Sequence, residues 1–98
     1  MAKVRRKPDV AQRTQYCHMY RVLLHNDDIT TFWFVMYILT GVFRLEVGKA
    51  AKVASQAHHT GISLVGVMPL EQAEFRVDRA HSMARAQKYP LTFTYEQE

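Results

Sequence analysis

The chain has 98 residues, of which 48% are hydrophobic and 22% are charged. This length fits one small domain with one core, and it excludes a second domain or a large cofactor-binding fold. The formal net charge of +4 is uneven, because residues 1–16 hold five basic side chains and one acidic one, whereas residues 17–98 hold eight of each. We therefore expect a flexible basic N-terminal arm over residues 1–16 and a neutral folded domain over residues 17–98.

Several features predict a cytoplasmic protein. The apolar stretches are interrupted well before the ~18 residues that a membrane span needs, and the start, MAKVRRKPDV, lacks the apolar segment of a secretory signal. The lone Cys17 cannot form an internal disulfide, which suits a reducing compartment. Because the positive charge is confined to the arm, we expect the folded domain to bind neither nucleic acid nor a membrane.

The first predicted element is a strand over residues 17–25, in the run CHMYRVLLH. Its buried side consists of alternate apolar residues: Tyr20, Val22 and Leu24. The strand ends at the turn NDD, residues 26–28, because short Asn and Asp side chains bond the local backbone. Either Thr30 or Thr31 then offers the N-cap of a helix.

Two helices are expected next. The first carries a wide apolar stripe at three- and four-residue spacing that ends near Leu45: Phe34, Val35, Ile38, Leu39, Val42 and Phe43. The second covers Val47 to His59, with Gly61 placed to end it. Its apolar side is built mainly from small residues at helical spacing: Ala50, Val53, Ala54 and Ala57.

The last part of the chain predicts a buried strand over residues 62–68, a third helix and a final strand. Pro69, Glu71 and Glu74 open the helix, and Tyr89-Pro90 breaks it. The stripe of the helix is Leu70, Ala73, Val77, Ala80 and Ala84, and the alternating residues of the strand are Leu91, Phe93 and Tyr95. The order β-α-α-β-α-β predicts a compact α+β sandwich, with a three-stranded antiparallel sheet packed against three helices.

A cluster of polar residues could carry chemistry. The run HNDD at residues 25–28 places two carboxylates and an amide at a strand-to-helix junction, and His58-His59 stands near the negative end of the second helix. If these two segments meet, their acceptors suit a primary ammonium, which has three donors and no acceptor. The alternative is structural, with Asn26, Asp27 and Asp28 only shaping the turn and His58 lying on the solvated surface.

A metal site is the main rival of another class. Its candidate ligands are of the right types: His25, Asp27, Asp28, His58 and His59. The chain has no Cys-x-x-Cys or His-x-x-x-His spacing that would enforce such a site, and two adjacent histidines on one helix rarely bind one metal. Hydrolytic catalysis is also disfavoured, because no serine has elbow glycines and Cys17 lies in an expected strand.

Four stretches, in order and at compatible distances, carry a family resemblance: YRVLLHNDDITTFWFV, AHHTG, VGVMPLEQAEFRV and YPLTFT. From Tyr20 to Tyr95 the chain resembles the ClpS family of adaptors, which bind N-degrons and deliver them to a Clp-type AAA+ protease. The resemblance implies a non-catalytic, ClpS-like recognition domain that needs no cofactor and acts as a monomer, preceded by a flexible arm.

The resemblance also implies roles for particular residues. Asn26, Asp28 and His58 match the ligands of the substrate's free α-amino group, with Asp27 supporting them electrostatically. The positions that match the side-chain pocket are Thr30, Phe32, Val35, Ile38, Ala54, Ala57 and Leu91. Val35, Ile38 and Leu91 would serve equally well as core residues, so their pocket role depends on the resemblance, and Thr30 could also be a helix cap.

The sequence departs from the family where selectivity would be set. Phe32 replaces a usual methionine at the entrance, and Trp33 replaces a commonly polar residue. Ala54 stands where a methionine or leucine is usual, and Ala57 stands where a valine is usual. These smaller side chains should deepen or widen the pocket. We expect Phe, Tyr and Trp to be accepted as first residues and Leu to be disfavoured, since a missing methylene in such a pocket costs about 1 to 3 kcal/mol.

Delivery to the protease needs a second surface. By resemblance, the start of the third helix, including Glu71 and Arg76, docks on the N-terminal domain of a ClpA- or ClpC-type unfoldase. Residues 1–16 would be the arm that the unfoldase pore engages. The alternative for Glu71 and Arg76 is an ordinary solvated helix face.

Overall fold

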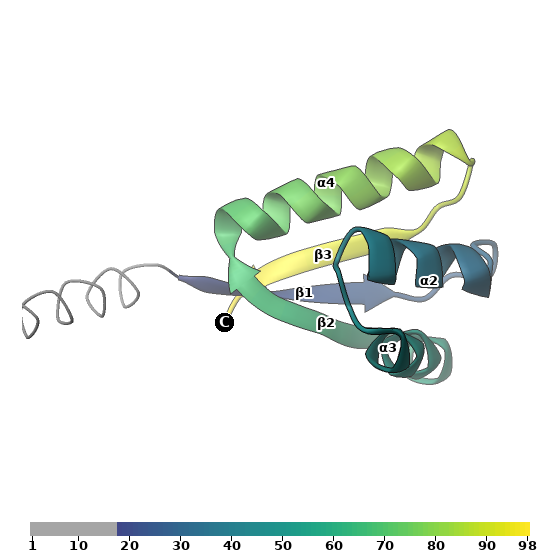
Figure 1. The fold of residues 1–98 in the computed structure, drawn as a ribbon, viewed down its shortest axis with the longest axis horizontal. Coiled ribbons are helices and arrows are strands. Elements are labelled where there is room, and N and C mark those ends of the chain that lie inside the picture. Colours follow the sequence, from purple (N-terminus) through teal and green to yellow (C-terminus); the bar gives the residue numbers. More distant parts are fainter. Residues whose placement is uncertain (1–17) are drawn as a thin grey trace, which may run out of the picture.

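The computed structural model describes residues 18–98 and contains six elements (Figure 1). In chain order they are β1 (Met19–His25), α2 (Phe32–Gly41), α3 (Val47–Thr60), β2 (Ile62–Pro69), α4 (Leu70–Ala86) and β3 (Thr92–Gln97). The predicted β-α-α-β-α-β order is confirmed. The predicted arm and the expected strand start at Cys17 lie outside the described residues. Within residues 18–98, no helix combines the length and apolar character needed to cross a membrane.

The three strands form one antiparallel sheet in the order β2-β1-β3, so β1 lies in the centre. Val22 and Leu24 of β1 and Phe93 of β3 are almost fully buried, in line with the predicted alternation. Helix α4 contacts all three strands, α3 contacts β1 and β2, and α2 packs on α3. Figure 1 shows α4 running along β3, whereas α2 and α3 lie at the end of the sheet where β1 finishes.

Helix α3 follows its prediction within one residue. The Glu46 side chain caps its start by accepting a hydrogen bond from the Lys49 N–H at 3.2 Å. Gly61 ends it with a left-handed φ of 95°, and the Gly61 N–H donates to the Ala57 carbonyl at 2.8 Å. The buried residues on α3 are Ala50, Val53, Ala54 and Ala57. Because three of these four are alanines, this face leaves space that larger side chains would fill.

Helix α2 is shorter than its apolar stripe predicts. Thr31 is the N-cap, its hydroxyl accepting from the Phe34 N–H at 3.2 Å, but the helix ends at Gly41, before the end of the stripe near Leu45. The chain leaves the helix because Arg44 adopts a left-handed φ of 60°. Phe43 stays buried beyond the helix end, with its ring 4.8 Å from that of Phe93. The stripe therefore continues over a turn that contributes to the same core.

Strand β2, predicted as a buried strand, is buried on one face only. Ser63, Val65 and Met68 face the core, and the Ser63 hydroxyl donates to the Val53 carbonyl at 2.7 Å. The opposite face leaves three aliphatic side chains exposed: Ile62, Leu64 and Val67. The strand has two different faces because the helices pack on one side of the sheet.

Helix α4 buries the predicted small residues and ends before the predicted Tyr89-Pro90 break. Its fully buried positions are Ala73, Val77, Ala80 and Ala84. The Arg85 guanidinium donates to the carbonyls of Tyr89 and Leu91, both at 2.8 Å, and so fixes the segment that leads into β3. The His81 Nε2 accepts from the Phe93 N–H at 2.9 Å, which ties the middle of α4 to β3.

Candidate functional site

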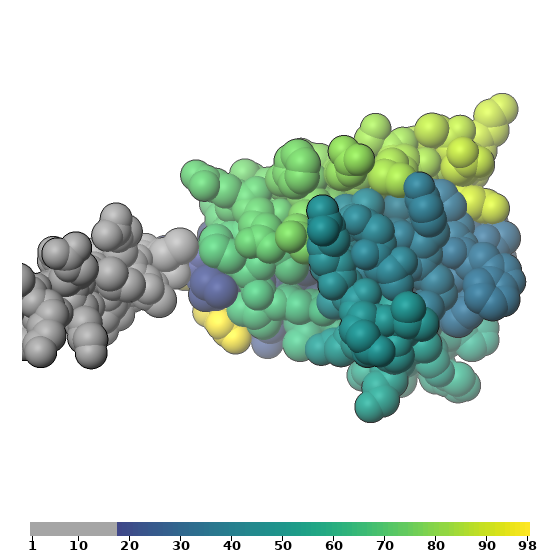
Figure 2. All heavy atoms as spheres, in the orientation of Figure 1, coloured from purple at the N-terminus to yellow at the C-terminus, as the bar shows by residue number. Residues whose placement is uncertain are grey.

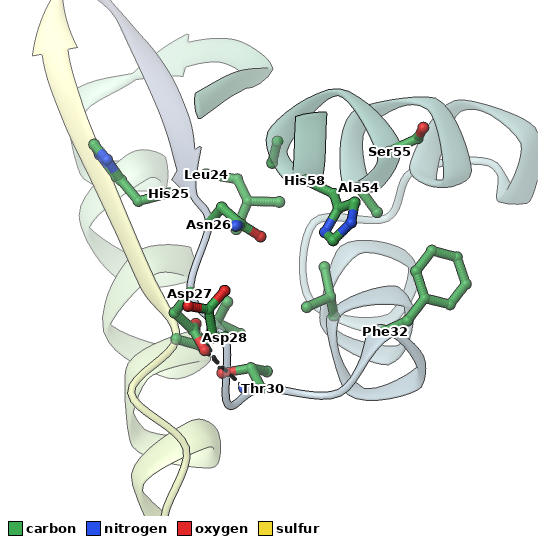
Figure 3. A pocket seen from close by; sticks show the side chains of 13 residues that line it. Leu24, His25, Asn26, Asp27, Asp28, Thr30, Phe32, Ala54, Ser55 and His58 are labelled. Carbon is green, nitrogen blue, oxygen red and sulfur yellow. Dashed lines mark hydrogen bonds between the residues drawn. The ribbon is translucent and has the colours of Figure 1, made fainter. Parts of the chain in front are cut away.

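A cavity of about 440 Å³ lies at the end of the molecule where β1 leads into α2 (Figure 3). It is bounded by the turn after β1, the start of α2, the second half of α3 and the residue before β3. Its lining consists of Leu24, His25, Asn26, Asp27, Asp28, Thr30, Phe32, Val35, Ala54, Ser55, Ala57, His58 and Leu91. None of these described residues is Lys or Arg, so the cavity combines anionic and neutral polar groups with an apolar wall.

The two aspartates of the turn are used differently. One Asp27 carboxylate oxygen accepts from the backbone N–H groups of Ile29 at 2.8 Å and Thr30 at 2.6 Å, and the other accepts from the Thr30 hydroxyl at 2.9 Å. Asp27 therefore fixes the shape of the turn. Asp28 is exposed and lines the cavity, which leaves its carboxylate available to a ligand.

A backbone hydrogen bond brings the turn to α3. The Asn26 N–H donates to the carbonyl of Gly61, the residue that ends α3, at 3.0 Å. His58 lies in the last turn of α3, and Figure 3 shows its ring facing the cavity across from the Asn26 side chain. His59 turns back to its own helix, where its Nδ1 lies 2.8 Å from the Ser55 carbonyl. Asn26, Asp28 and His58 therefore border one cavity.

The rest of the cavity is apolar. Ala54, Ala57 and Leu91 form its inner wall and are 6%, 2% and 1% exposed. Phe32 stands at the mouth, 48% exposed. Figure 3 shows Phe32 on the side of the cavity away from Asn26. The site thus has a polar end rich in acceptors and an apolar recess, which suits a ligand with a cationic group next to a large apolar side chain.

This combination can be compared with known proteins. The family model for the ATP-dependent Clp protease adaptor protein ClpS matches residues 15–94. The chain belongs to the ClpS family. The family, the fold class and the adaptor function predicted from the sequence are confirmed.

Individual ClpS proteins are similar along most of their length. The ClpS adapter of Desulfatibacillum aliphaticivorans is 40% identical over 87 residues, which cover 89% of this chain and 84% of that protein. The ClpS adapter of Desulforapulum autotrophicum is 41% identical over 100 residues, covering 94% and 96%. A solved structure of Agrobacterium tumefaciens ClpS2 bound to L-phenylalaninamide is 34% identical with a TM-score of 0.79, and the match covers 83% of this chain and 98% of that one.

One residue expected in the ClpS side-chain pocket lies elsewhere. Ile38 is 0% exposed and belongs to the core instead of the cavity lining. Three residues that line the cavity were not among those predicted: Leu24, His25 and Ser55. A sequence signal existed for Ser55, which lies three residues before His58 and so on the same face of the helix.

The metal alternative finds no support in this ClpS fold. Within residues 18–98, no three His, Cys, Asp or Glu side chains come close enough to hold a metal ion. Three of the candidate ligands have other partners: the His25 Nε2 lies 2.7 Å from the Thr94 hydroxyl, Asp27 accepts hydrogen bonds from its own turn, and His59 lies against the Ser55 carbonyl.

The two residues expected to dock the unfoldase differ in their surroundings. Glu71 is exposed in the first turn of α4. Arg76 is half-buried, and its guanidinium donates to the carbonyl of Phe43 at 3.0 Å, just beyond the end of α2. Arg76 thus has a structural contact within the domain, whereas the side chain of Glu71 is open to a partner.

Proposed function

We propose that this ClpS adaptor binds the first residue of a polypeptide and delivers that polypeptide to a Clp protease. The observation that carries the proposal is the single cavity shared by three acceptor side chains and an apolar recess. Asn26, Asp28 and His58 hold the free α-amino group, whose three donors match three acceptors. Charge-assisted hydrogen bonds of this kind contribute about 1.5 to 3 kcal/mol each.

The side chain of the first residue enters the apolar recess behind Phe32. Burying one large apolar side chain contributes about 1.5 to 3 kcal/mol, which together with the amine contacts exceeds an association cost of at least ~4 kcal/mol. The ligand of the related ClpS2 supports this assignment, because L-phenylalaninamide carries a free amine beside a phenyl ring. The small side chains of Ala54 and Ala57 leave a wide recess, which favours aromatic first residues over Leu.

Delivery uses the start of α4 and the basic arm. Figure 1 shows the N-terminal end of α4 at the end of the sheet opposite α2 and α3, so a partner docked there leaves the cavity open. Glu71 and Arg76 of α4 contact the N-terminal domain of a ClpA- or ClpC-type unfoldase, and the unfoldase pore engages residues 1–16. The adaptor works in the cytoplasm as a monomer, and it recognises substrates without catalysing a reaction.

The decisive experiment is a binding series with short peptides that differ only in their first residue, each with an N-acetylated control. We expect roughly micromolar affinity for Phe, Tyr and Trp, weaker binding of Leu, and loss of binding on acetylation, which removes the charge that the carboxylates attract. Equal binding of acetylated and free peptides would contradict the amine site. A preference for Leu over all three aromatics would contradict the proposed selectivity.

A further inference from the structure

Helix α2 exposes two aromatic side chains that the core does not use. Trp33 is 77% exposed and Tyr37 is 59% exposed. Because they are four residues apart in one helix, they share a face, which we call the aromatic face of α2. Polar residues normally occupy the solvent side of a surface helix, and neighbouring exposed apolar side chains mark interaction sites.

The aromatic face of α2 is continuous with the cavity. Phe32 lines the cavity mouth, and its ring meets that of Trp33 edge to face, with the centroids 5.3 Å apart and an interplanar angle of 77°. Figure 2 shows the atoms of α2, in blue, exposed at the end of the molecule beside those of α3, in teal. Apolar surface therefore runs from the mouth of the cavity onto the outside of α2.

The proposed function fixes the path of a bound peptide. Its α-amino group lies at the Asn26 end of the cavity, and Phe32 stands on the other side, so the chain leaves past Phe32 (Figure 3). Side chains alternate along an extended chain, so when residue one points into the cavity, residue three points toward the same surface and residue two points away. Residue three is about 7 Å further along. The Trp33 ring lies 5.3 Å from the ring of Phe32 at the cavity mouth, so a chain that leaves past Phe32 brings residue three within reach of Trp33.

We propose that Trp33 and Tyr37 form a second subsite, which binds the third residue of the substrate and favours an aromatic side chain there. The inference rests on the proposed function and narrows its substrate class to chains with an apolar first residue followed by an aromatic third residue. An added aromatic pair at a partly exposed site strengthens binding by about three- to tenfold.

The chain contains a single tryptophan, so the emission of Trp33 reports on this subsite directly. We would titrate the full chain with Phe-Ala-Phe, Phe-Ala-Ala and Phe-Phe-Ala peptides, all C-terminally amidated, and with L-phenylalaninamide. We expect Phe-Ala-Phe to bind about three- to tenfold more tightly than Phe-Ala-Ala and to shift the Trp33 emission to the blue. L-Phenylalaninamide, which has no third residue, binds without that shift.

Variants assign the effect to residues, with affinities measured by displacement of a labelled Phe-Ala-Phe peptide. Trp33→Ala and Tyr37→Ala should each reduce the preference for Phe at position three while keeping the affinity for L-phenylalaninamide. Phe75→Ala is the matched control, because Phe75 is 65% exposed on α4 and does not line the cavity.

The outcomes separate this inference from the proposed function. If L-phenylalaninamide binds but Phe-Ala-Phe and Phe-Ala-Ala bind equally, the second subsite is wrong and the proposed function stands. A preference for Phe at position two instead of position three would show that the second residue of the peptide, and not the third, contacts the subsite. Equal effects of Phe75→Ala and Trp33→Ala on this preference would show that the aromatic face of α2 does not form the subsite. If L-phenylalaninamide does not bind, both proposals fail.

Discussion

Two adjacent carboxylates of identical chemistry have separate roles in this domain. Asp27 accepts three hydrogen bonds from its own turn, whereas Asp28 faces the cavity. The positions of their backbones within the turn determine this difference, which neither residue type nor sequence spacing would reveal. In the proposed site, one acid therefore holds the loop and the other is left to contact the ligand.

Alanine substitutions should separate these two roles. We expect Asp28→Ala to lower the affinity for free-amine peptides by about ten- to a hundredfold with an unchanged melting temperature, since one charge-assisted contact is lost. Asp27→Ala removes the hydrogen bonds of the turn and should lower the free energy of unfolding by about 1 to 2 kcal/mol. Peptide titration and thermal unfolding of both variants provide the measurements. A loss of stability in Asp28→Ala with retained affinity would show that the roles are reversed.

At the scale of elements, the contact between α4 and β3 responds to pH. Burial, and then the positive charge of Arg85, lowers the pKa of His81 from its ordinary value of 6.5. In its neutral form the His81 Nε2 accepts from the Phe93 N–H, and a protonated ring could not. Because the unfolded chain takes up this proton more readily than the folded one, protonation favours unfolding.

The expected result is a loss of stability in acid. The contribution of His81 is complete above pH 6.5 and falls as the pH drops from 6.5 toward the lower pKa of the folded state. His81→Gln keeps an acceptor for the Phe93 N–H but does not titrate, so its free energy of unfolding should depend less on pH in this range. Urea unfolding at several pH values tests this, with His59→Gln as the control that retains the effect. Identical pH profiles for His81→Gln and the unmodified chain would contradict it.

The elements also show how far the sequence predicts the fold. Helical and alternating periodicity located all six elements, because each buries one regular face. Periodicity did not locate the end of α2, where a left-handed Arg44 breaks the helix while Phe43 still packs in the core. Nor did it show that β2 has an open face, since aliphatic residues occupy both of its sides.

The candidate site was only partly predictable. The acidic turn and the histidine pair stand out in the sequence as groups of acceptors, but they meet through the pairing of β1 with β2, which places His25 opposite Ile62, and through the bond between the Asn26 N–H and the Gly61 carbonyl. Both groups of that bond belong to the main chain, so it leaves no trace in residue types. Ile38 was assigned to the pocket by the family resemblance, yet its place in the wide apolar stripe of α2 turns it to the core, while Val35 lines the cavity.

For the whole molecule, charge distinguishes residues 1–16 from the rest of the chain. Residues 1–16 carry the entire net charge, and the cavity is formed by residues within the folded domain. Removing residues 1–16 should therefore leave the affinity for peptides with a free N-terminal Phe unchanged, while delivery to the protease is lost. Peptide titration and degradation of a substrate that begins with Phe, by the Clp protease of the same cell, test the two parts. Degradation at an undiminished rate without the arm would show that the arm has no role in delivery.

The main-chain hydrogen bond between the turn and the end of α3 has a consequence for how selectivity can evolve. Since it involves no side-chain atom, mutating the residues around the cavity does not remove the tie that keeps its two halves together. Libraries randomised at Phe32, which is 48% exposed, should thus yield receptors with new preferences at little risk of misfolding, whereas the buried Ala54 and Ala57 accept only side chains that fit into the cavity. For the same reason, duplicated genes can diverge in the first residues that their products recognise while the fold is retained.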